Sequence, residues 1–293
     1  MNRFHKDSER LRILRLEEQN TDRGPGLSVD MWDRRMKNWK QNFWKENVQY
    51  GKAMNRVKET ASYLRGLGLL GPETTVIDIG CGPGRFVSEF AHTARRAVGV
   101  DISPRAIEYA RMFAQETGQD NTAFLVSDFK SMDLAAAGLE DTYDLAFCSL
   151  SPAVSGLEGL QKFMDLSRQW CCMNAIVSGH HELHERIGRE VFQKDTLDSW
   201  NGKHFYSSFN LLFLSGYLPV TSYYAQTKEN DRPVSREFAE ISASIILAPE
   251  ERCEAAIDRI FQWMTEHADE NGNLHERSVF TYGRLLWNIH RTC

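Results

Sequence analysis

Twelve residues, TVIDIGCGPGRF at positions 75–86, restrict the possible folds of this chain more than any other segment. An uninterrupted apolar stretch runs into Asp78, as in a buried parallel strand, and glycines follow at 80, 82 and 84. A strand that ends in alternating glycines lets a ligand lie against the backbone, because glycine has no side chain to block the approach. The segment therefore predicts an α/β fold with a ligand-binding turn after this strand.

The residues around this turn alternate between expected strands and expected helices, and Ser103 and Pro104 stand where an N-cap and a first helical residue belong. Strands are expected at 75–80, 96–103, 122–129, 143–150, 174–180, 216–229 and 278–290. Helices are expected at 1–20, 31–43, 56–70, 84–94, 104–118 and within 151–171, with further helices at 181–200, 235–246 and 250–268. This alternation predicts parallel β-α-β units whose ligand lies at the carboxyl ends of the strands.

The glycine spacing excludes two common nucleotide-binding turns. A dinucleotide fingerprint that begins at Gly80 would need glycine at position 85, where this chain has Arg85. A phosphate-binding loop of the Walker type would need a G-K-[ST] sequence, and none follows. Two acidic residues instead end the next strands: Asp101 comes 21 residues after Gly80, and Asp128 follows the third strand.

These residues together resemble motif I and the following acidic positions of the class I S-adenosylmethionine-dependent methyltransferases, over about residues 55–180. The resemblance implies a Rossmann-like, seven-stranded, mostly parallel sheet with helices on both faces. It also implies S-adenosylmethionine as cofactor, with S-adenosylhomocysteine as product. An N-terminal helical cap and helical inserts before the last strand, at about 181–215 and 235–270, complete the expected architecture.

The same resemblance assigns cofactor contacts by position. Asp101 is expected to hold the ribose diol, because one carboxylate accepts two hydrogen bonds, and Asp128 is expected near the adenine amino group. The full expected set is Asp78, Gly80, Cys81, Gly82, Gly84, Asp101, Ile102, Asp128, Phe129 and Ser149. Other interpretations stay open for single members: Asp78 orients the loop instead of touching ligand, the glycines only form a tight turn, and Cys81 is a small loop residue rather than a nucleophile.

The acceptor side is less well defined by sequence, because methyl transfer is an in-line displacement that depends mainly on alignment. His180 and His181 follow the fifth strand, so they are the candidate catalytic bases. His180 and His184 have the i, i+4 spacing at which two histidines on a helix can bind a metal. The sequence has no H-E-x-x-H motif and no evident third ligand, however, so we predict no metal. Capping or surface histidines remain the alternative.

The segment 31–58 combines basic residues with aromatic ones, a composition that also occurs in RNA-binding surfaces. Its aromatic residues lie at helical spacing, however, so we predict a lid packed over the mouth of the active site. Basic residues on such a lid favour an acidic small molecule as methyl acceptor. Candidate substrate contacts are Tyr50, Trp200, His204 and Tyr206.

The expected organisation is a tail and cap at 1–54, a cofactor-binding core at 55–180 and a substrate-shaping part at 181–293. A net charge of −5 argues against nucleic acid as a partner, and no apolar run is long enough to span a membrane. Few cysteines and no signal sequence predict a cytoplasmic protein. The leading functional prediction is a small-molecule methyltransferase. The alternatives are a non-catalytic cofactor-binding scaffold or, as a third option, an RNA or protein methyltransferase.

Overall fold

The computed structural model describes residues 8–20, 28–36, 48–194 and 202–291. By its internal contacts the chain divides into two units, which are described separately. The first unit comprises residues 1–176, 202–223 and 283–293, and the second comprises residues 177–201 and 224–282. This grouping reflects contacts alone, so the functional boundaries expected at 54 and 180 stay a prediction.

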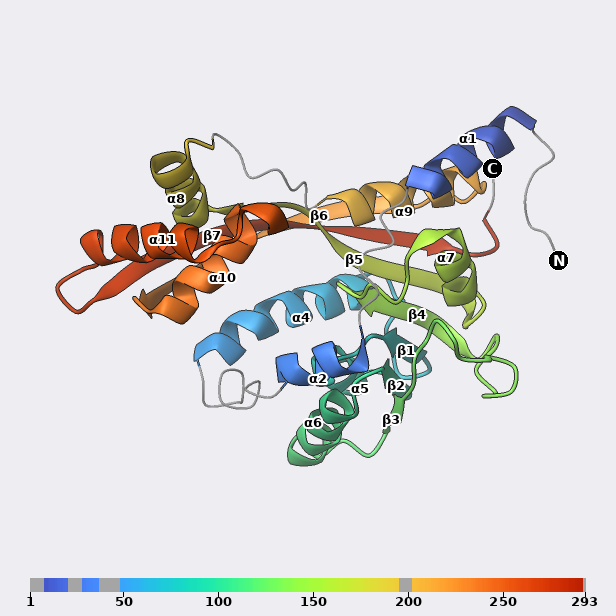
Figure 1. Ribbon diagram of the computed structural model, residues 1–293. Helices are drawn as coiled ribbons and strands as arrows, with labels where there is room; N and C mark the ends of the chain where they lie inside the picture. The colour runs from blue at the N-terminus through green and yellow to red at the C-terminus, as the bar shows by residue number, and fades with distance from the viewer. Residues whose placement is uncertain (1–7, 21–27, 37–47, 195–201, 292–293) are drawn as a thin grey trace. The chain divides into compact units, whose positions relative to one another are not determined.

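Seven strands form one sheet in the order β3-β2-β1-β4-β5-β7-β6 (Figure 1). The first five are β1 (Thr75–Ile79), β2 (Arg96–Asp101), β3 (Thr122–Val126), β4 (Tyr143–Ser149) and β5 (Ser167–His181). All pairings among these five strands are parallel. The last two are β6 (Val220–Pro233) and β7 (Asn273–Asn288). The predicted seven-stranded, mostly parallel α/β fold is confirmed.

The helices beside β1, β2 and β3 are α5 (Arg85–Ala91) and α6 (Pro104–Glu116). Three phenylalanines lock α5 onto the sheet: the ring of Phe147 on β4 lies 4.8 Å from Phe86 and 5.0 Å from Phe90, measured between ring centroids. The predicted cap of α6 is present, because the Ser103 side chain accepts a hydrogen bond from the Ala106 N–H and Pro104 follows it. These helices fix the loops that begin at the carboxyl ends of the strands.

Among the described residues, the helices that precede the sheet in sequence are α1 (Ser8–Asn20), α2 (Val29–Met36) and α4 (Val48–Gly66). Within the first unit, α4 packs against α5, α2 packs against α6, and α1 packs against α9 (Lys203–Leu214). The short helix α7 (Gly156–Met164) also contacts α9. The expected helical stripe of 31–43 is thus described only as far as Met36, and its remainder lies outside the described residues.

The fifth strand begins earlier than the sequence suggested. The strand was expected to start at residue 174, after a helix within 151–171, but α7 ends at Met164 and β5 already starts at Ser167. The physical reason is the apolar run Cys171–Met173, which is fully buried beside β4 and therefore favours a core strand. The predicted strand 174–180 therefore corresponds only to the second half of β5.

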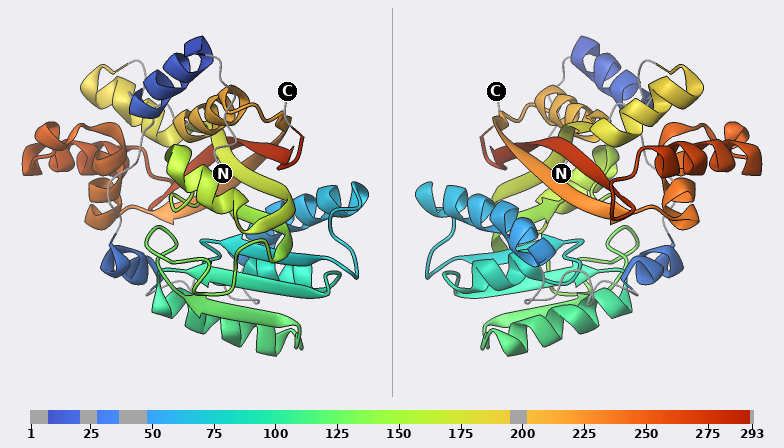
Figure 2. Two further views of the ribbon diagram at one scale, coloured as in Figure 1. Left: turned by 90° about the vertical axis from the view of Figure 1, so that its right-hand side faces the viewer. Right: turned by 90° about the vertical axis from the view of Figure 1, so that its left-hand side faces the viewer.

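The described part of the second unit contains helices and one portion each of β5, β6 and β7. Its helices are α8 (Glu182–Phe192), α10 (Arg236–Ile246) and α11 (Glu254–Glu266), with the short helix η1 (Pro249–Glu251) between the last two. Figure 2 shows α10 and α11 side by side, and both pack against α8. Their shared core includes Ile187, Phe238 and Ile260, all at most 1% exposed. None of the described helices is both long and apolar enough to cross a membrane.

Candidate active site

The glycine turn after β1 is held tightly to the neighbouring strand. The N–H groups of Gly80 and Cys81 both donate to the Val100 carbonyl oxygen, at 2.7 and 3.0 Å. Gly80, Gly82 and Gly84 all have positive φ angles, which side chains of L-residues rarely allow. The turn therefore presents bare backbone at the carboxyl end of β1, as the sequence predicted.

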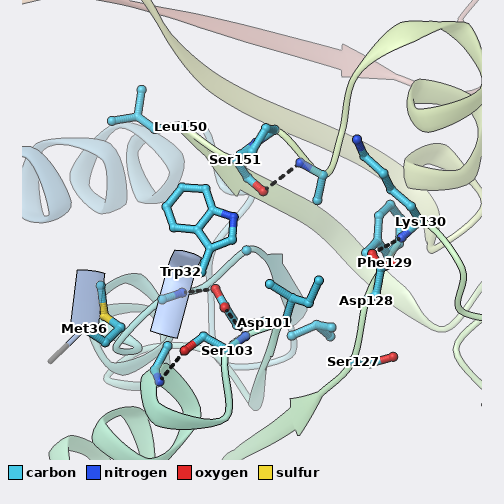
Figure 3. A pocket seen from close by; sticks show the side chains of 17 residues that line it. Trp32, Met36, Asp101, Ser103, Ser127, Asp128, Phe129, Lys130, Leu150 and Ser151 are labelled. Carbon is cyan, nitrogen blue, oxygen red and sulfur yellow. Dashed lines mark hydrogen bonds between the residues drawn. The ribbon is translucent and has the colours of Figure 1, made fainter. Parts of the chain in front are cut away.

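A cavity of about 360 Å³ opens beside this turn, within the first unit (Figure 3). Its wall is built from the ends of β1, β2, β3 and β4 and from helix α2. The lining residues that carry the argument are Trp32, Gly82, Asp101, Asp128, Phe129 and Ser151. A cavity of this size accommodates one small organic ligand, and its position matches the ligand crevice of open α/β sheets.

Asp101 is the best-positioned anion in the cavity. Its Oδ2 accepts a hydrogen bond from the Gly82 N–H at 2.8 Å, and its Oδ1 accepts one from the Ser103 N–H at 2.9 Å. Burial raises the pKa of this carboxyl, while those backbone donors act in the opposite direction. Because a carboxylate offers about four lone-pair sites, Asp101 keeps acceptor capacity for a ligand.

Asp128 and Phe129 lie across the cavity from α2 in the view of Figure 3. Asp128 is fixed by the N–H of Lys130 and the hydroxyl of Ser131, at 3.0 and 3.2 Å. The Phe129 ring is 3% exposed and has the Lys162 ammonium 5.3 Å from its centroid. A flat apolar face next to a hydrogen-bonding carboxylate suits a purine base with an exocyclic amine.

Helix α2 forms one side of the cavity through Trp32 and Met36. It is anchored by Asp33, whose Oδ1 accepts from the Ser103 hydroxyl at 2.6 Å and from the Arg105 N–H at 3.1 Å. The Ser103 hydrogen bond is the main reason why the pKa of Asp33 is lowered. These contacts tie α2 to the first turn of α6, directly beside Asp101.

Four of the predicted cofactor residues do not line the cavity, although they lie next to it in sequence. Cys81 and Asp78 are buried, Gly84 is the N-cap of α5, and Ser149 accepts a hydrogen bond from Arg56 at 2.6 Å. The predicted residues in the wall are Gly80, Gly82, Asp101, Ile102, Asp128 and Phe129. Their part in binding remains a prediction.

Asp78 has the most unusual surroundings of these residues. Its side chain is 2% exposed, and neither carboxylate oxygen has a hydrogen-bond partner among the described residues. Burial raises the pKa of Asp78 well above its usual value, the charge of Asp101 adds to the effect, and Arg56 counteracts it. An unpaired buried carboxyl beneath a ligand-binding loop is a costly arrangement.

The candidate bases belong to the second unit. His180 is exposed and its Nδ1 lies 3.2 Å from Glu185, whereas His181 is half-buried and its Nδ1 lies 2.9 Å from the Ser278 hydroxyl. Burial is the main cause of the lowered pKa of His181. Since the cavity belongs to the first unit, a catalytic role for either histidine stays a prediction.

The candidate substrate residues are only partly described. The side chain of Tyr50 and the whole of Trp200 lie outside the described residues. His204 and Tyr206 stand on α9, which packs against α1 and α7, and they are absent from the cavity wall as described. Their predicted contact with substrate therefore stays untested.

The residues that follow β4 also line the cavity. Leu150, Ser151 and Pro152 form part of its wall, and Leu150 has a φ of 57°, rare for a residue with a branched side chain. Such backbone strain is common at ligand-binding sites. The sequence indicated Leu150 as a lining residue and Ser151 as a possible cofactor or acceptor contact, whereas Pro152 was expected only to start a helix.

Comparison with known proteins shows the family to which this chain is similar. The family model described as "Methyltransferase domain" matches residues 70–233, more than half of the sequence. A probable cobalt-precorrin-6B C(15)-methyltransferase (decarboxylating) from Methanobrevibacter smithii is 29% identical over 94 residues, which cover 28% of this chain and 50% of that protein. Ribosomal protein L11 methyltransferase from Edwardsiella ictaluri is 32% identical over 121 residues, covering 38% of this chain and 40% of that one. The chain thus spans half or less of the length of these curated relatives.

A solved structure of similar architecture is the magnesium protoporphyrin IX methyltransferase of Synechocystis PCC 6803 with bound SAH. The match has a TM-score of 0.48 and 13% sequence identity, and it covers 87% of this chain and 96% of that one.

Proposed function

This chain belongs to the class I S-adenosylmethionine-dependent methyltransferase family, and we propose that it transfers the methyl group of S-adenosylmethionine to a small, anionic acceptor. The observation that carries the proposal is Asp101 in the wall of a ligand-sized cavity, beside the bare backbone of Gly82. This arrangement suits the ribose and adenine of the family's cofactor.

The proposed binding mode starts from the adenosine end of the cofactor. The remaining acceptor capacity of Asp101 takes the ribose hydroxyls, Asp128 accepts from the adenine amino group, and Phe129 packs on the base. Gly80 and Gly82 allow the cofactor to lie against the turn. Charge-assisted hydrogen bonds of this kind are stronger than neutral ones, so Asp101 should contribute most of the discrimination for a diol.

The charge near the end of β4 supports an anionic group at the methionine end of the cavity. Arg56 donates to Ser149 at 2.6 Å, so its guanidinium lies at the carboxyl end of that strand. A guanidinium is always charged at neutral pH and pairs well with carboxylates. The Arg56 guanidinium would favour binding of the cofactor's own carboxylate or of an acid group on the acceptor. The expected lid residues would add further basic side chains.

The transfer itself needs alignment more than it needs a particular catalytic group. The acceptor nucleophile must lie in line with the methyl carbon and the sulfur, and water must be excluded while the sulfonium becomes a neutral thioether. Trp32 and Met36 on α2 supply an apolar wall suited to that exclusion. A base is required only if the acceptor arrives protonated.

The names of the relatives include a precorrin methyltransferase and a ribosomal protein methyltransferase, so they do not select the acceptor class. The net charge of −5 supports a small molecule over RNA. A non-catalytic cofactor-binding scaffold remains the alternative of another class.

The experiment supplies the purified full chain with S-adenosylmethionine and with separate low-mass, protein and RNA fractions of a cell extract, and measures the release of S-adenosylhomocysteine. We expect release with the low-mass fraction, concentrated in its anion-exchange-bound part. Release with the protein or RNA fraction only would contradict the small-molecule acceptor, and binding without release from any fraction would support the scaffold. Arg56→Gln separates the two roles of that residue: weaker binding of S-adenosylhomocysteine indicates a cofactor contact, and a raised KM for the acceptor indicates an acceptor contact.

A further inference from the structure

Two histidines and a glutamate gather in the second unit, apart from the cavity described above. His181 ends β5, His184 lies in the first turn of α8, and Glu276 stands on β7. One ligand atom from each of the three residues lies within 4.8 Å of the other two. From this geometry we propose that His181, His184 and Glu276 bind a single zinc ion.

The strongest evidence is the state of His184. Its side chain is 1% exposed, and neither ring nitrogen has a hydrogen-bond partner among the described residues. Buried polar atoms are almost always paired in folded proteins, so two unpaired nitrogens on one ring need an explanation. A metal bond to one nitrogen provides it, because a neutral imidazole is the form that binds metals.

His181 is oriented for the same purpose. Its Nδ1 lies 2.9 Å from the hydroxyl of Ser278, so Nε2 is the ring nitrogen that would bind the metal. Histidines that bind metals commonly donate their second nitrogen to such a partner, which fixes the tautomer and the ring orientation. The ring centroids of His181 and His184 are 5.3 Å apart, so both rings face the same small volume.

The third ligand supplies the negative charge. Glu276 is partly buried, and its Oε2 forms a long ion pair of 3.7 Å with Arg232. At that distance the guanidinium compensates the charge of the carboxylate. It does not form the short bidentate hydrogen bonds that would use both carboxylate oxygens. Phe238 and Phe280 pack edge-on against His184 and His181, so the cluster has an apolar surround that strengthens electrostatic bonds.

The donor set indicates the metal. Two imidazoles and one carboxylate form a common zinc site, in which a fourth position stays open for water or another ligand. Magnesium and calcium prefer all-oxygen sites and do not fit this set. Tetrahedral bonds of about 2.1 Å separate neighbouring ligand atoms by roughly 3.4 Å, so small side-chain rotations bring these atoms into place.

The site also explains why the sequence suggested no metal. His180 and His184 have helical spacing, but His180 is exposed and paired with Glu185. The structure instead joins His184 to His181, three positions earlier, and to Glu276 on a distant strand. A histidine bound to zinc is not a free base, so under this proposal His181 is a ligand and no longer a candidate base.

The experiment uses the full chain, freed of metal with a chelator, and titrates it with Zn²⁺ and with Mg²⁺ by calorimetry. We expect one Zn²⁺ per chain, no response to Mg²⁺, and a higher unfolding temperature with Zn²⁺. Glu276→Gln and His184→Leu, which keep the side-chain volume nearly constant, should each weaken zinc binding at least about a hundredfold. Ser278→Ala should weaken it about tenfold, as loss of an outer-shell partner does.

His275→Ala is the matched control, because His275 is exposed, neighbours Glu276 and pairs with Asp231 outside the cluster. It should bind zinc as the wild type does. Absence of zinc binding by the wild type, unchanged binding by Glu276→Gln, or an equal loss in His275→Ala would each overturn the proposal. If His184→Leu fails to fold by circular dichroism, Glu276→Gln and Ser278→Ala decide. Binding of S-adenosylhomocysteine is measured on the same samples, and it shows separately whether the cavity of the first unit is intact.

Discussion

Changing Gly82 or Gly84 to alanine should damage the protein for two different physical reasons. A methyl group at Gly82 would meet no atom within 4 Å, and this residue lines the cavity. A methyl group at Gly84 would lie 2.8 Å from the Cβ of Ala110 and 3.1 Å from the ring of Phe124. The first glycine is therefore expected to keep space for the ligand, and the second to keep space for α6 and β3.

The magnitudes follow from these contacts. Both positions have a positive φ, so an alanine at either one is strained by roughly 1–2 kcal/mol. At Gly84 the overlap with Ala110 adds the cost of overpacking, roughly 1–3 kcal/mol, so Gly84→Ala should lose about 2–5 kcal/mol of unfolding free energy. Gly82→Ala should lose only about 1–2 kcal/mol. Its affinity for S-adenosylhomocysteine should fall at least about tenfold, which is about 1.4 kcal/mol.

Urea unfolding measures the stability, and calorimetric titration with S-adenosylhomocysteine measures the affinity. Adding Ala110→Gly to Gly84→Ala removes the closest clash, so the double variant should recover about 1 kcal/mol or more beyond additivity. Ala110→Gly alone costs about 1 kcal/mol, because glycine weakens a helix interior. Unchanged affinity in a folded Gly82→Ala protein would refute the ligand argument. Full stability in Gly84→Ala would refute the packing argument.

Three further changes test the acids around the turn. Asp101→Asn, which keeps the shape but not the charge, should weaken S-adenosylhomocysteine binding by about 2 kcal/mol in calorimetry while NAD shows no binding, and tight NAD binding would contradict the cofactor assignment. Asp33→Ala should free α2 from α6, seen as faster amide exchange in residues 29–36 with affinity reduced about tenfold, because the bonds to Ser103 and Arg105 are lost. Asp78→Asn should raise the unfolding free energy at pH 7 by at least about 1 kcal/mol. The pKa of Asp78 is raised in the folded state, so its cost grows as pH rises above the usual value of 3.8, and the advantage of the variant should vanish below that pH in urea titrations.

The sequence predicted the sheet because its signals are local. Apolar runs that end in glycine or aspartate defined β1, β2 and β3, and the Ser103–Pro104 pair defined the start of α6. The family resemblance gave six residues of the cavity wall, and each of them lies at the end of a strand or within a few residues after it. Strand ends of a parallel sheet meet at one edge, so sequence order alone brings these residues together.

The rest depended on contacts between distant segments. Nothing in the local sequence tells that Asp33 accepts a hydrogen bond from Ser103, the contact that ties α2 to α6. The third member of the histidine cluster, Glu276, lies on the last strand, far from both histidines in the sequence. The start of β5 was missed because a buried apolar run of this length fits a helix as well as a strand.

The buried carboxyl of Asp78, close to Asp101, favours a positively charged ligand. Asp78 lacks a hydrogen-bond partner among the described residues, and Asp101 raises its pKa further, so the free protein bears a cost at this place. Arg56 offsets the cost only in part, because burial still dominates the shift. A cofactor with a sulfonium and an ammonium group would supply the missing positive charge when it binds. Asp78→Asn should therefore become more stable and bind S-adenosylmethionine more weakly at the same time.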